Sequence, residues 1–293
     1  MYFILFFIMI SFSSTYSYVT KTLLRVTEPN KLRDYLKSEI NKNYKYLTYP
    51  NSKKILHNEI GDIDIYGDGS LEKNVEHIYP QSKFKNKEKR TMMRSDLHNL
   101  YLCNTKLNNI RQNFKYMDTK ELNIDDDIKI LDMKGKEIIN KNEIFKKFGY
   151  IMGTNNKKKI FIPTNYSRGK IARSLSYFTI KYDFLNELND IINIKTLIEW
   201  NLKDPVDNDE YLKNIKVYKH QGNLNPFILE PDLVHYCFSD KIEITEEILS
   251  KKRQSSINHL YSINYLVNEI KELEREKKER DIIINKLSNT SKK

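Results

Sequence analysis

Several residue types are scarce in this sequence. Its 293 residues include two cysteines, eight glycines, seven prolines and one tryptophan. Cys103 and Cys237 could close one long loop if they paired, but two cysteines exclude the disulfide framework of a small secreted domain. No Cys-x-x-Cys pair occurs, which argues against a thiolate zinc site. A chain of this length can still bury a substantial core, as one large domain or two small ones.

The sequence also lacks a hydrophobic run long enough for a transmembrane helix. Residues 1–12 are almost entirely apolar, but a span requires about 20 residues. Small polar residues follow at Ser13, Ser14 and Thr15, as in the cleavage region of a secretory signal peptide. Because no Lys or Arg precedes the run, an N-terminal strand or a membrane anchor remain alternatives. We predict a signal peptide over residues 1–17 and a secreted or periplasmic protein.

Positive charge is in excess. Lysine and arginine number 50 against 39 acidic residues, a formal net charge of +11, and most of the excess precedes residue 240. Such a balance favours a polyanionic partner, either nucleic acid or an anionic membrane surface. The alternative is biased residue usage, because Lys, Asn, Ile and Tyr are all abundant.

Two short strands and a helix are predicted in the middle of the chain. Residues 74–78 have the pattern of a strand that Pro80 ends, and a polar, basic loop follows over residues 81–94. A return strand is expected over residues 97–102. Asn104 is a suitable N-cap for a helix over residues 105–112. Further along, residues 167–170 are predicted to form a basic turn before a helix over residues 171–182.

These elements carry the groups needed for phosphodiester hydrolysis around a hard divalent metal ion. Glu76 and Asn108 offer oxygen ligands, and His77 offers a base whose pKa is near neutrality. Arg111, one turn after Asn108, can reach the same helix face, and Asn113 could fix the following loop. An isolated Glu-His pair is more often a surface carboxylate beside a structural histidine, so only the conjunction favours a site.

A histidine base makes a prediction about pH. It must be neutral to accept a proton, so activity should fall below its pKa. A rate that stayed flat down to about pH 5 would argue against His77 as the base.

Five ordered segments resemble the endonuclease I family, bacterial periplasmic or secreted nucleases with a ββα-metal (His-Me finger) core. The resemblance covers about three quarters of the chain, from residue 23 to residue 238. The segments are residues 76–82 (EHIYPQS), 95–100 (SDLHNL), 107–113 (LNNIRQN), 169–173 (GKIAR) and 200–227, which contains DPV and QGNLNPF.

The resemblance implies a role for each central residue. His77 would be the general base, and Glu76 and Asn108 would bind one Mg²⁺ or a substitute such as Mn²⁺ or Ca²⁺. The family cleaves DNA, and often RNA, with little sequence preference and leaves 5′-phosphates. Its phosphate-clamping arginine has two candidates here, Arg90 and Arg94.

Other predicted site residues lie in the same segments. Arg111 either acts in catalysis or braces the metal-binding helix. Lys170 and Arg173 are predicted to face the nucleic-acid cleft. Structural support is expected from a set of buried or loop-fixing polar residues, namely Asp96, His98, Asn99, Asn113 and Asn225.

We therefore predict an α+β protein built around a ββα-metal core. Its predicted parts are the signal peptide, a nuclease domain over residues 18–239, and a charged helical tail over residues 240–293 that could form a short coiled coil. A monomer is expected, with a tail-mediated dimer as the alternative. Two other functions remain open: a catalytically inactive nucleic-acid-binding protein on the same fold, and a membrane-tethered interaction protein.

Overall fold

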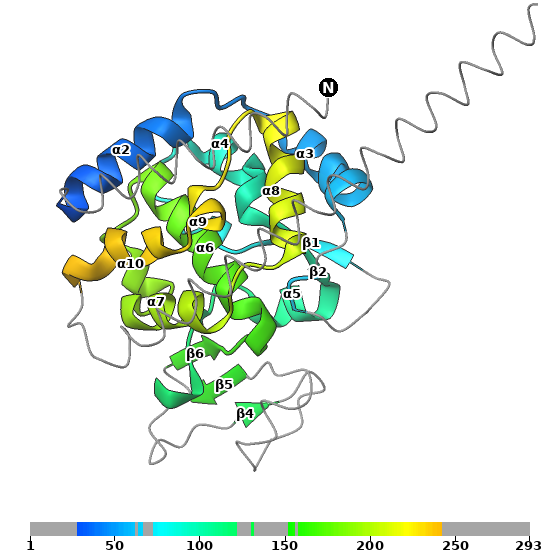
Figure 1. Cartoon of the computed structure of the whole chain (residues 1–293). Coiled ribbons are helices and arrows are strands. Elements are labelled where there is room, and N and C mark those ends of the chain that lie inside the picture. The colour runs from blue at the N-terminus through cyan, green and yellow to red at the C-terminus, as the bar shows by residue number, and fades with distance from the viewer. Residues whose placement is uncertain are drawn as a thin grey trace, which may run out of the picture. The chain divides into compact units, whose positions relative to one another are not determined.

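The computed structural model describes residues 28–61, 64–66, 73–121, 130–131, 152–155 and 158–241 (Figure 1). The chain divides into two compact units, Thr27–Ser255 and a second made of Met1–Val26 with Ser256–Lys293. Every described residue belongs to Thr27–Ser255, and the fold below is that of this unit. The predicted signal peptide and nearly all of the predicted helical tail lie outside the described residues.

Helices dominate the described part of the chain, and short strands form two small sheets. This mixture, mostly helical, agrees with the predicted α+β class. The helices are α2 (Pro29–Asn41), α3 (Tyr49–Ile55), α4 (Arg90–Ser95), α5 (Thr105–Arg111), α6 (Asn165–Tyr182), α7 (Ile194–Lys203), α8 (Asn208–Gln221), α9 (Pro226–Leu229) and α10 (Asp232–Phe238), and the strands are β1 (Lys73–His77), β2 (Leu100–Asn104), β3 (Lys115–Tyr116), β4 (Ile130–Leu131), β5 (Met152–Asn155) and β6 (Lys158–Phe161).

Strands β1 and β2 pair antiparallel, with His77 opposite Leu100 and Lys73 opposite Asn104. Helix α5 begins directly after β2 and packs against both strands. The Asn104 side chain accepts hydrogen bonds from the backbone N–H groups of Lys106 and Leu107, at 2.7 and 3.2 Å. Asn104 is thus the predicted N-cap, and it fixes the direction in which α5 leaves the sheet.

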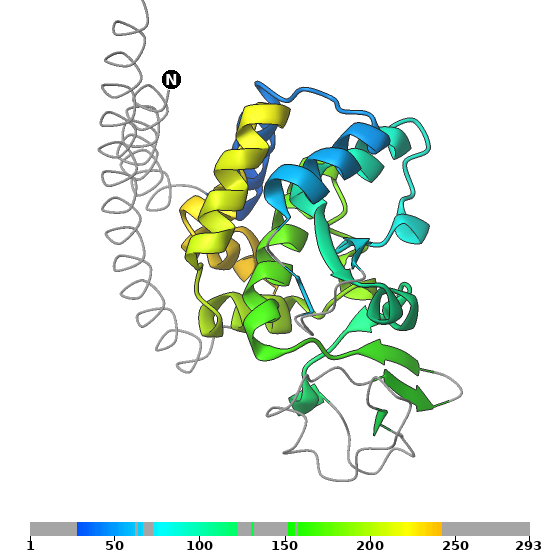
Figure 2. The same cartoon turned by 90° about the vertical axis from the view of Figure 1, so that its right-hand side faces the viewer.

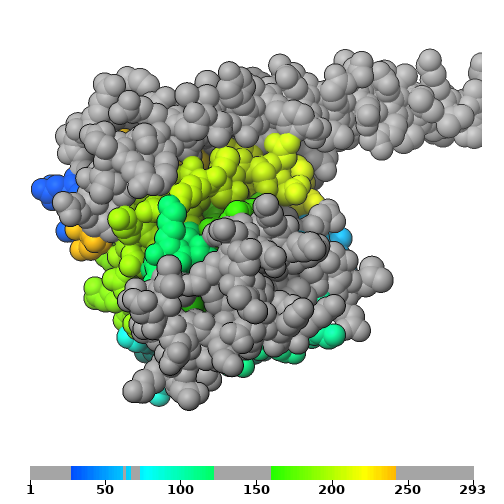
Figure 3. All heavy atoms as spheres, turned by 90° about the horizontal axis from the view of Figure 1, so that it is seen from below, coloured from blue at the N-terminus to red at the C-terminus, as the bar shows by residue number. Residues whose placement is uncertain are grey.

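The second sheet has the order β3-β6-β5-β4, with β3 parallel to β6 and the other pairs antiparallel. It is joined to the helices by the segment around residues 116–121. Tyr116 bridges to Ile192, and the Trp200 indole N–H donates to Asp118 at 2.9 Å. In Figure 3 this segment (green) lies against α7 (yellow-green).

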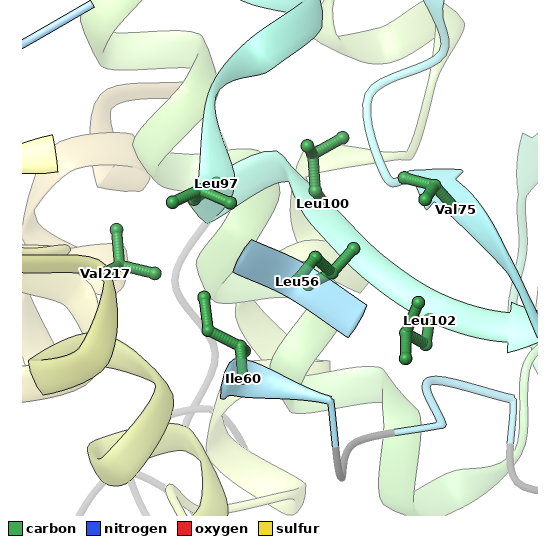
Figure 4. Packing of buried hydrophobic residues seen from close by; sticks show 7 residues of the cluster. All are labelled: Leu56, Ile60, Val75, Leu97, Leu100, Leu102 and Val217. Carbon is green, nitrogen blue, oxygen red and sulfur yellow. The ribbon is translucent and has the colours of Figure 1, made fainter. Parts of the chain in front are cut away.

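A hydrophobic cluster lies beside the two-stranded sheet (Figure 4). It joins both strands to the turn after α3 and to α8, through Leu56, Ile60, Val75, Leu97, Leu100, Leu102 and Val217. Each such side chain contributes roughly 1.5–3 kcal/mol when fully buried. Because successive strand residues point to opposite faces, Val75 faces this cluster while Glu76 faces α5. The cluster therefore fixes which way the polar residues of β1 point.

Helix α6 departs most from the prediction. The predicted basic turn over residues 167–170 lies inside this helix, which runs through the centre of the unit (Figures 1 and 2). Its side chains from Ser167 to Tyr182 are all buried. Gly169 permits this arrangement, because a Cβ there would collide with the backbone oxygen of Asp204. The predicted strand over residues 97–102 likewise begins only at Leu100, after a 3-10 turn at Leu97–Asn99.

Candidate active site

His77 ends β1 and is almost completely buried, with 5% of its surface exposed. Its Nε2 lies 2.9 Å from the backbone oxygen of Arg94, and its Nδ1 lies 3.2 Å from the side-chain nitrogen of Gln81. A carbonyl oxygen only accepts hydrogen bonds, so Nε2 carries the proton. Nδ1 therefore keeps its lone pair and accepts from the Gln81 amide. The nitrogen available as a base is Nδ1.

Burial, helped by the positive charges of Arg94 and Arg111, lowers the pKa of His77 to about 4 against the hydrogen bond to the Arg94 carbonyl, which raises it. The ring is therefore neutral, as a base must be, well below the ordinary pKa of histidine. The predicted fall in activity is therefore expected near pH 4 rather than above pH 5. A rate that stays flat to that pH is compatible with His77 as the base.

Glu76 lies on the opposite face of β1 and is 2% exposed. Its Oε1 accepts a hydrogen bond from the Tyr66 hydroxyl at 2.9 Å and pairs with the Arg111 guanidinium at 3.0 Å. Burial raises the pKa of Glu76, while Arg111 and Tyr66 oppose that rise. A bound dication would stabilise the charged carboxylate further.

Asn108 lies in the middle of α5 and is half-buried. Its side-chain nitrogen donates to the backbone oxygen of Val75 at 3.0 Å, next to Glu76 in the sequence. Its amide oxygen has no hydrogen-bond partner among the described residues. The amide is thus held against β1 with its oxygen available to a ligand.

These two oxygen donors fit a hard divalent ion such as Mg²⁺, which prefers carboxylate and carbonyl oxygens together with water. Among the described residues, no group of three or more His, Cys, Asp or Glu side chains could hold a metal. Glu76 and Asn108 would hold a metal at this place, with water or phosphate oxygens as further ligands.

Arg111 is fully buried at 1% exposure and is directed at the end of β1. Its two terminal nitrogens donate to the backbone oxygens of His77 at 3.1 Å and Ile78 at 2.8 Å, and its guanidinium lies 4.6 Å from the centre of the Tyr116 ring. Together with the ion pair to Glu76, these contacts tie α5 to the end of β1. They fit the bracing role that was predicted as the alternative to a catalytic role.

The two candidate phosphate-binding arginines, Arg90 and Arg94, are both exposed on α4. The Arg94 guanidinium lies 4.2 Å over the centre of the Tyr49 ring. The centre of that ring lies 5.7 Å from the centre of the His77 ring. Arg94 is thus linked to His77 through Tyr49 as well as through its own backbone.

Lys170 and Arg173 are placed differently from the prediction. Lys170 is 4% exposed and pairs with Asp207, and Arg173 is 0% exposed and pairs with Glu210, its Nε lying 2.9 Å from Oε1. Both lie on the central helix α6, where Arg173 neutralises the buried Glu210 and Lys170 pairs with the partly exposed Asp207. The proposed nucleic-acid surface therefore excludes Arg173, which has no exposed donor.

Asp96 and His98 form the centre of a buried polar network. The Asp96 carboxylate accepts from Lys181 at 2.7 Å and from the Tyr182 hydroxyl at 2.8 Å. The His98 ring lies 3.1 Å from the Asn223 backbone oxygen, and burial lowers the pKa of His98 to about 3. Both side chains are buried within this hydrogen-bonded network.

Three asparagines predicted as structural support make local contacts. Asn99 exchanges two hydrogen bonds with the backbone of Tyr79, at 2.7 and 3.1 Å. Asn113 is exposed and donates to the Ser82 hydroxyl at 3.0 Å. Asn225 caps α9 by accepting from the Phe227 N–H at 3.0 Å.

Four residues of the site are absent from the sequence prediction: Tyr49, Tyr66, Gln81 and Tyr116. Gln81 lies four residues after His77 in a predicted segment, and that spacing is a usable signal. The tyrosines come from separate parts of the chain, among 20 tyrosines in all. Nothing in the sequence distinguishes them from the others.

Comparison with known proteins identifies relatives of this chain. A family model described as Endonuclease I matches residues 9–232. An extracellular ribonuclease of Bacillus subtilis (strain 168) is 35% identical over 85 residues, which cover 24% of this chain and 30% of that protein. An extracellular ribonuclease of Bacillus amyloliquefaciens is 33% identical over 85 residues, covering 24% and 29%. The aligned part thus spans less than a third of these curated relatives.

Proposed function

The chain belongs to the endonuclease I family, and from this we propose that it is a metal-dependent endonuclease with little sequence preference. Its proposed substrate is DNA, with 5′-phosphate products, and RNA is the second substrate to test because two relatives are named ribonucleases. The observation that carries the proposal is the fixed tautomer of His77 beside Glu76 and Asn108. The sheet β1–β2 followed by α5 is the proposed ββα-metal core.

His77 is proposed to activate the attacking water. The backbone oxygen of Arg94 holds Nε2–H, so the lone pair of Nδ1 can take the proton of a water that replaces the Gln81 amide. The water oxygen forms a bond to phosphorus as the bond to the 3′-oxygen breaks. The leaving oxygen takes a proton from solvent, giving a 5′-phosphate and a 3′-hydroxyl.

Glu76 and Asn108 are the proposed metal ligands. A bound Mg²⁺ would supply charge stabilisation at the phosphate oxygens and the leaving oxygen. Tyr66 and Arg111 orient the Glu76 carboxylate through the contacts at 2.9 and 3.0 Å. The Val75 backbone oxygen orients the Asn108 amide.

We also propose that the protein is secreted and acts as a monomer. The apolar run at residues 1–12 and the extracellular relatives support export. No helix among the described residues is long and apolar enough to cross a membrane. Sequencing the N-terminus of the exported protein tests the proposal, since a start after residue 12 is expected and an intact leader would contradict it.

The test of activity is degradation of supercoiled plasmid, and in parallel of a structured RNA, with Mg²⁺ and with EDTA. We expect degradation with Mg²⁺ and none with EDTA. Equal degradation in EDTA would contradict metal dependence. Tight binding without degradation under every metal tested would support the inactive nucleic-acid-binding alternative.

A further inference from the structure

One exposed arginine differs from the buried ones in its partners. Arg94 has no carboxylate partner among the described residues, although its side chain is held in place on the Tyr49 ring. The four buried arginines of the described residues all pair with carboxylates, as Arg33–Asp240, Arg111–Glu76, Arg168–Asp118 and Arg173–Glu210. Arg94 therefore has a fixed position and unused hydrogen-bond donors.

Tyr49 is a rigid support for this guanidinium. It is the first residue of α3 and is followed by Pro50, whose ring restricts the backbone at the helix start. Its half-buried side chain packs against the hydrophobic cluster beside β1 and β2. The Ser52 hydroxyl donates to the backbone oxygen of Ser95 at 2.7 Å, which ties α3 to the end of α4 beside Arg94.

The same tyrosine also contacts the proposed base. The Tyr49 and His77 rings have centres 5.7 Å apart and planes inclined by 32°. The Arg94 backbone meanwhile accepts the Nε2–H of His77. Tyr49, Arg94 and His77 thus form one connected unit, with the guanidinium at its solvent side.

We propose that Tyr49 is a positioning residue, which holds Arg94 flat beside His77 so that the guanidinium binds a backbone phosphate of the substrate at the cleavage site. This inference rests on the proposed nuclease function. The Tyr49 ring contacts the guanidinium from one side, at 4.2 Å from its central carbon, and N–H groups directed away from the ring can form a bidentate contact with phosphate. A lysine in its place would keep the charge but lose the planar contact.

A double-mutant cycle tests the coupling between the two residues. Arg94→Gln, Tyr49→Leu and the double variant are compared with wild type by kcat and KM on one duplex DNA. Arg94→Gln is expected to raise KM about tenfold or more. Tyr49→Leu is expected to raise KM about threefold to tenfold by releasing the guanidinium. The double variant is expected to be no worse than Arg94→Gln alone.

Conservative variants separate positioning from mere packing. Tyr49→Phe keeps the aromatic ring, so its KM should stay within about twofold of the wild-type value. Arg94→Lys keeps the charge but loses the planar guanidinium, so its KM should rise nearly as much as that of Arg94→Gln. Lys195→Gln removes one exposed positive charge on α7 and is the charge-matched control. Thermal melting shows whether each variant is folded.

Binding of a fluorescent duplex in EDTA, measured with His77→Ala proteins, gives a readout independent of cleavage. Arg94→Gln should lower the slope of log Kd against log salt by about one, as expected for the loss of one phosphate contact. If the effects of Tyr49→Leu and Arg94→Gln multiply in the folded double variant, the inference is wrong. If wild type binds but never cleaves, the proposed function fails, and the binding cycle still decides the role of Tyr49.

Discussion

His77 and His98 are two neutral histidines buried for different purposes. His98 donates its Nε2–H to the Asn223 backbone oxygen within the buried Asp96 network. His77 lies at the end of β1, and its Nδ1 is directed at the Gln81 side chain. Burial lowers the pKa of both rings, to about 3 and about 4. One consequence concerns the stability of the fold in acid.

Stability should decrease as pH falls below the ordinary histidine pKa of 6.5. Between that value and about 3, the unfolded chain binds a proton at His98 that the folded protein does not bind. The expected loss is up to about 1.4 kcal/mol for each pH unit. Urea unfolding from pH 7 to pH 5 measures it, and His98→Gln should flatten the dependence. The same slope in wild type and in His98→Gln would contradict this account.

Tyr66 is expected to influence metal binding without touching the metal. Its hydroxyl donates to Glu76 at 2.9 Å and lies 3.1 Å from the Tyr116 hydroxyl. Tyr66→Phe removes this contact with little change in volume, so the Mg²⁺ concentration for half-maximal activity should rise about tenfold. A Mg²⁺ titration of activity, with Tyr46→Phe at an exposed tyrosine as control, checks this. An unchanged half-maximal concentration would count against Glu76 as a ligand.

At the scale of elements, α6 and α8 are joined by the buried pair of Arg173 and Glu210. Arg173→Met leaves Glu210 buried without a counter-charge, and the free energy of unfolding should fall by about 3–5 kcal/mol. The double variant with Glu210→Gln should recover part of the loss. Urea unfolding measures both. A stable Arg173→Met protein that bound DNA weakly would restore the predicted nucleic-acid role of Arg173.

The local elements of the proposed core follow from short-range signals. Asn104 as an N-cap, Pro80 after the first strand and the apolar run at residues 100–102 are all local signals, and β1, β2 and α5 lie close to their predicted positions. Helix α6 shows what such signals miss. Its basic start suggests a surface turn, but long-range pairing with Asp207 and Glu210 makes burial possible. Only the tertiary fold brings those partners together.

The candidate site likewise contains residues that local sequence signals predict and residues that only the tertiary fold brings in. The pair Glu76–His77 and the helix carrying Asn108 are close enough in sequence to be recognised as a set. Tyr49 and Tyr66 reach them from earlier segments, through the packing of α3 and an isolated bridge near residue 64. Their roles depend on ring positions, which no residue spacing specifies.

For the whole molecule, the net charge of +11 agrees with a nucleic-acid substrate. Exposed lysines on α3 and in the segment before α4 are Lys53, Lys54, Lys85, Lys87 and Lys89, and Lys85 pairs with Glu187. The buried arginines are neutralised by carboxylates, so the positive charge available to a substrate comes from exposed side chains such as these lysines.

The most direct test is the cleavage rate of His77→Ala on a defined duplex with Mg²⁺, at saturating enzyme. Removing the base should lower the rate by about 10²–10⁴-fold while leaving duplex binding in EDTA within about twofold. His57→Ala, at an exposed histidine, is the matched control and should cleave at the wild-type rate. Equal cleavage by His77→Ala and wild type would contradict His77 as the base and, with it, the proposed active site.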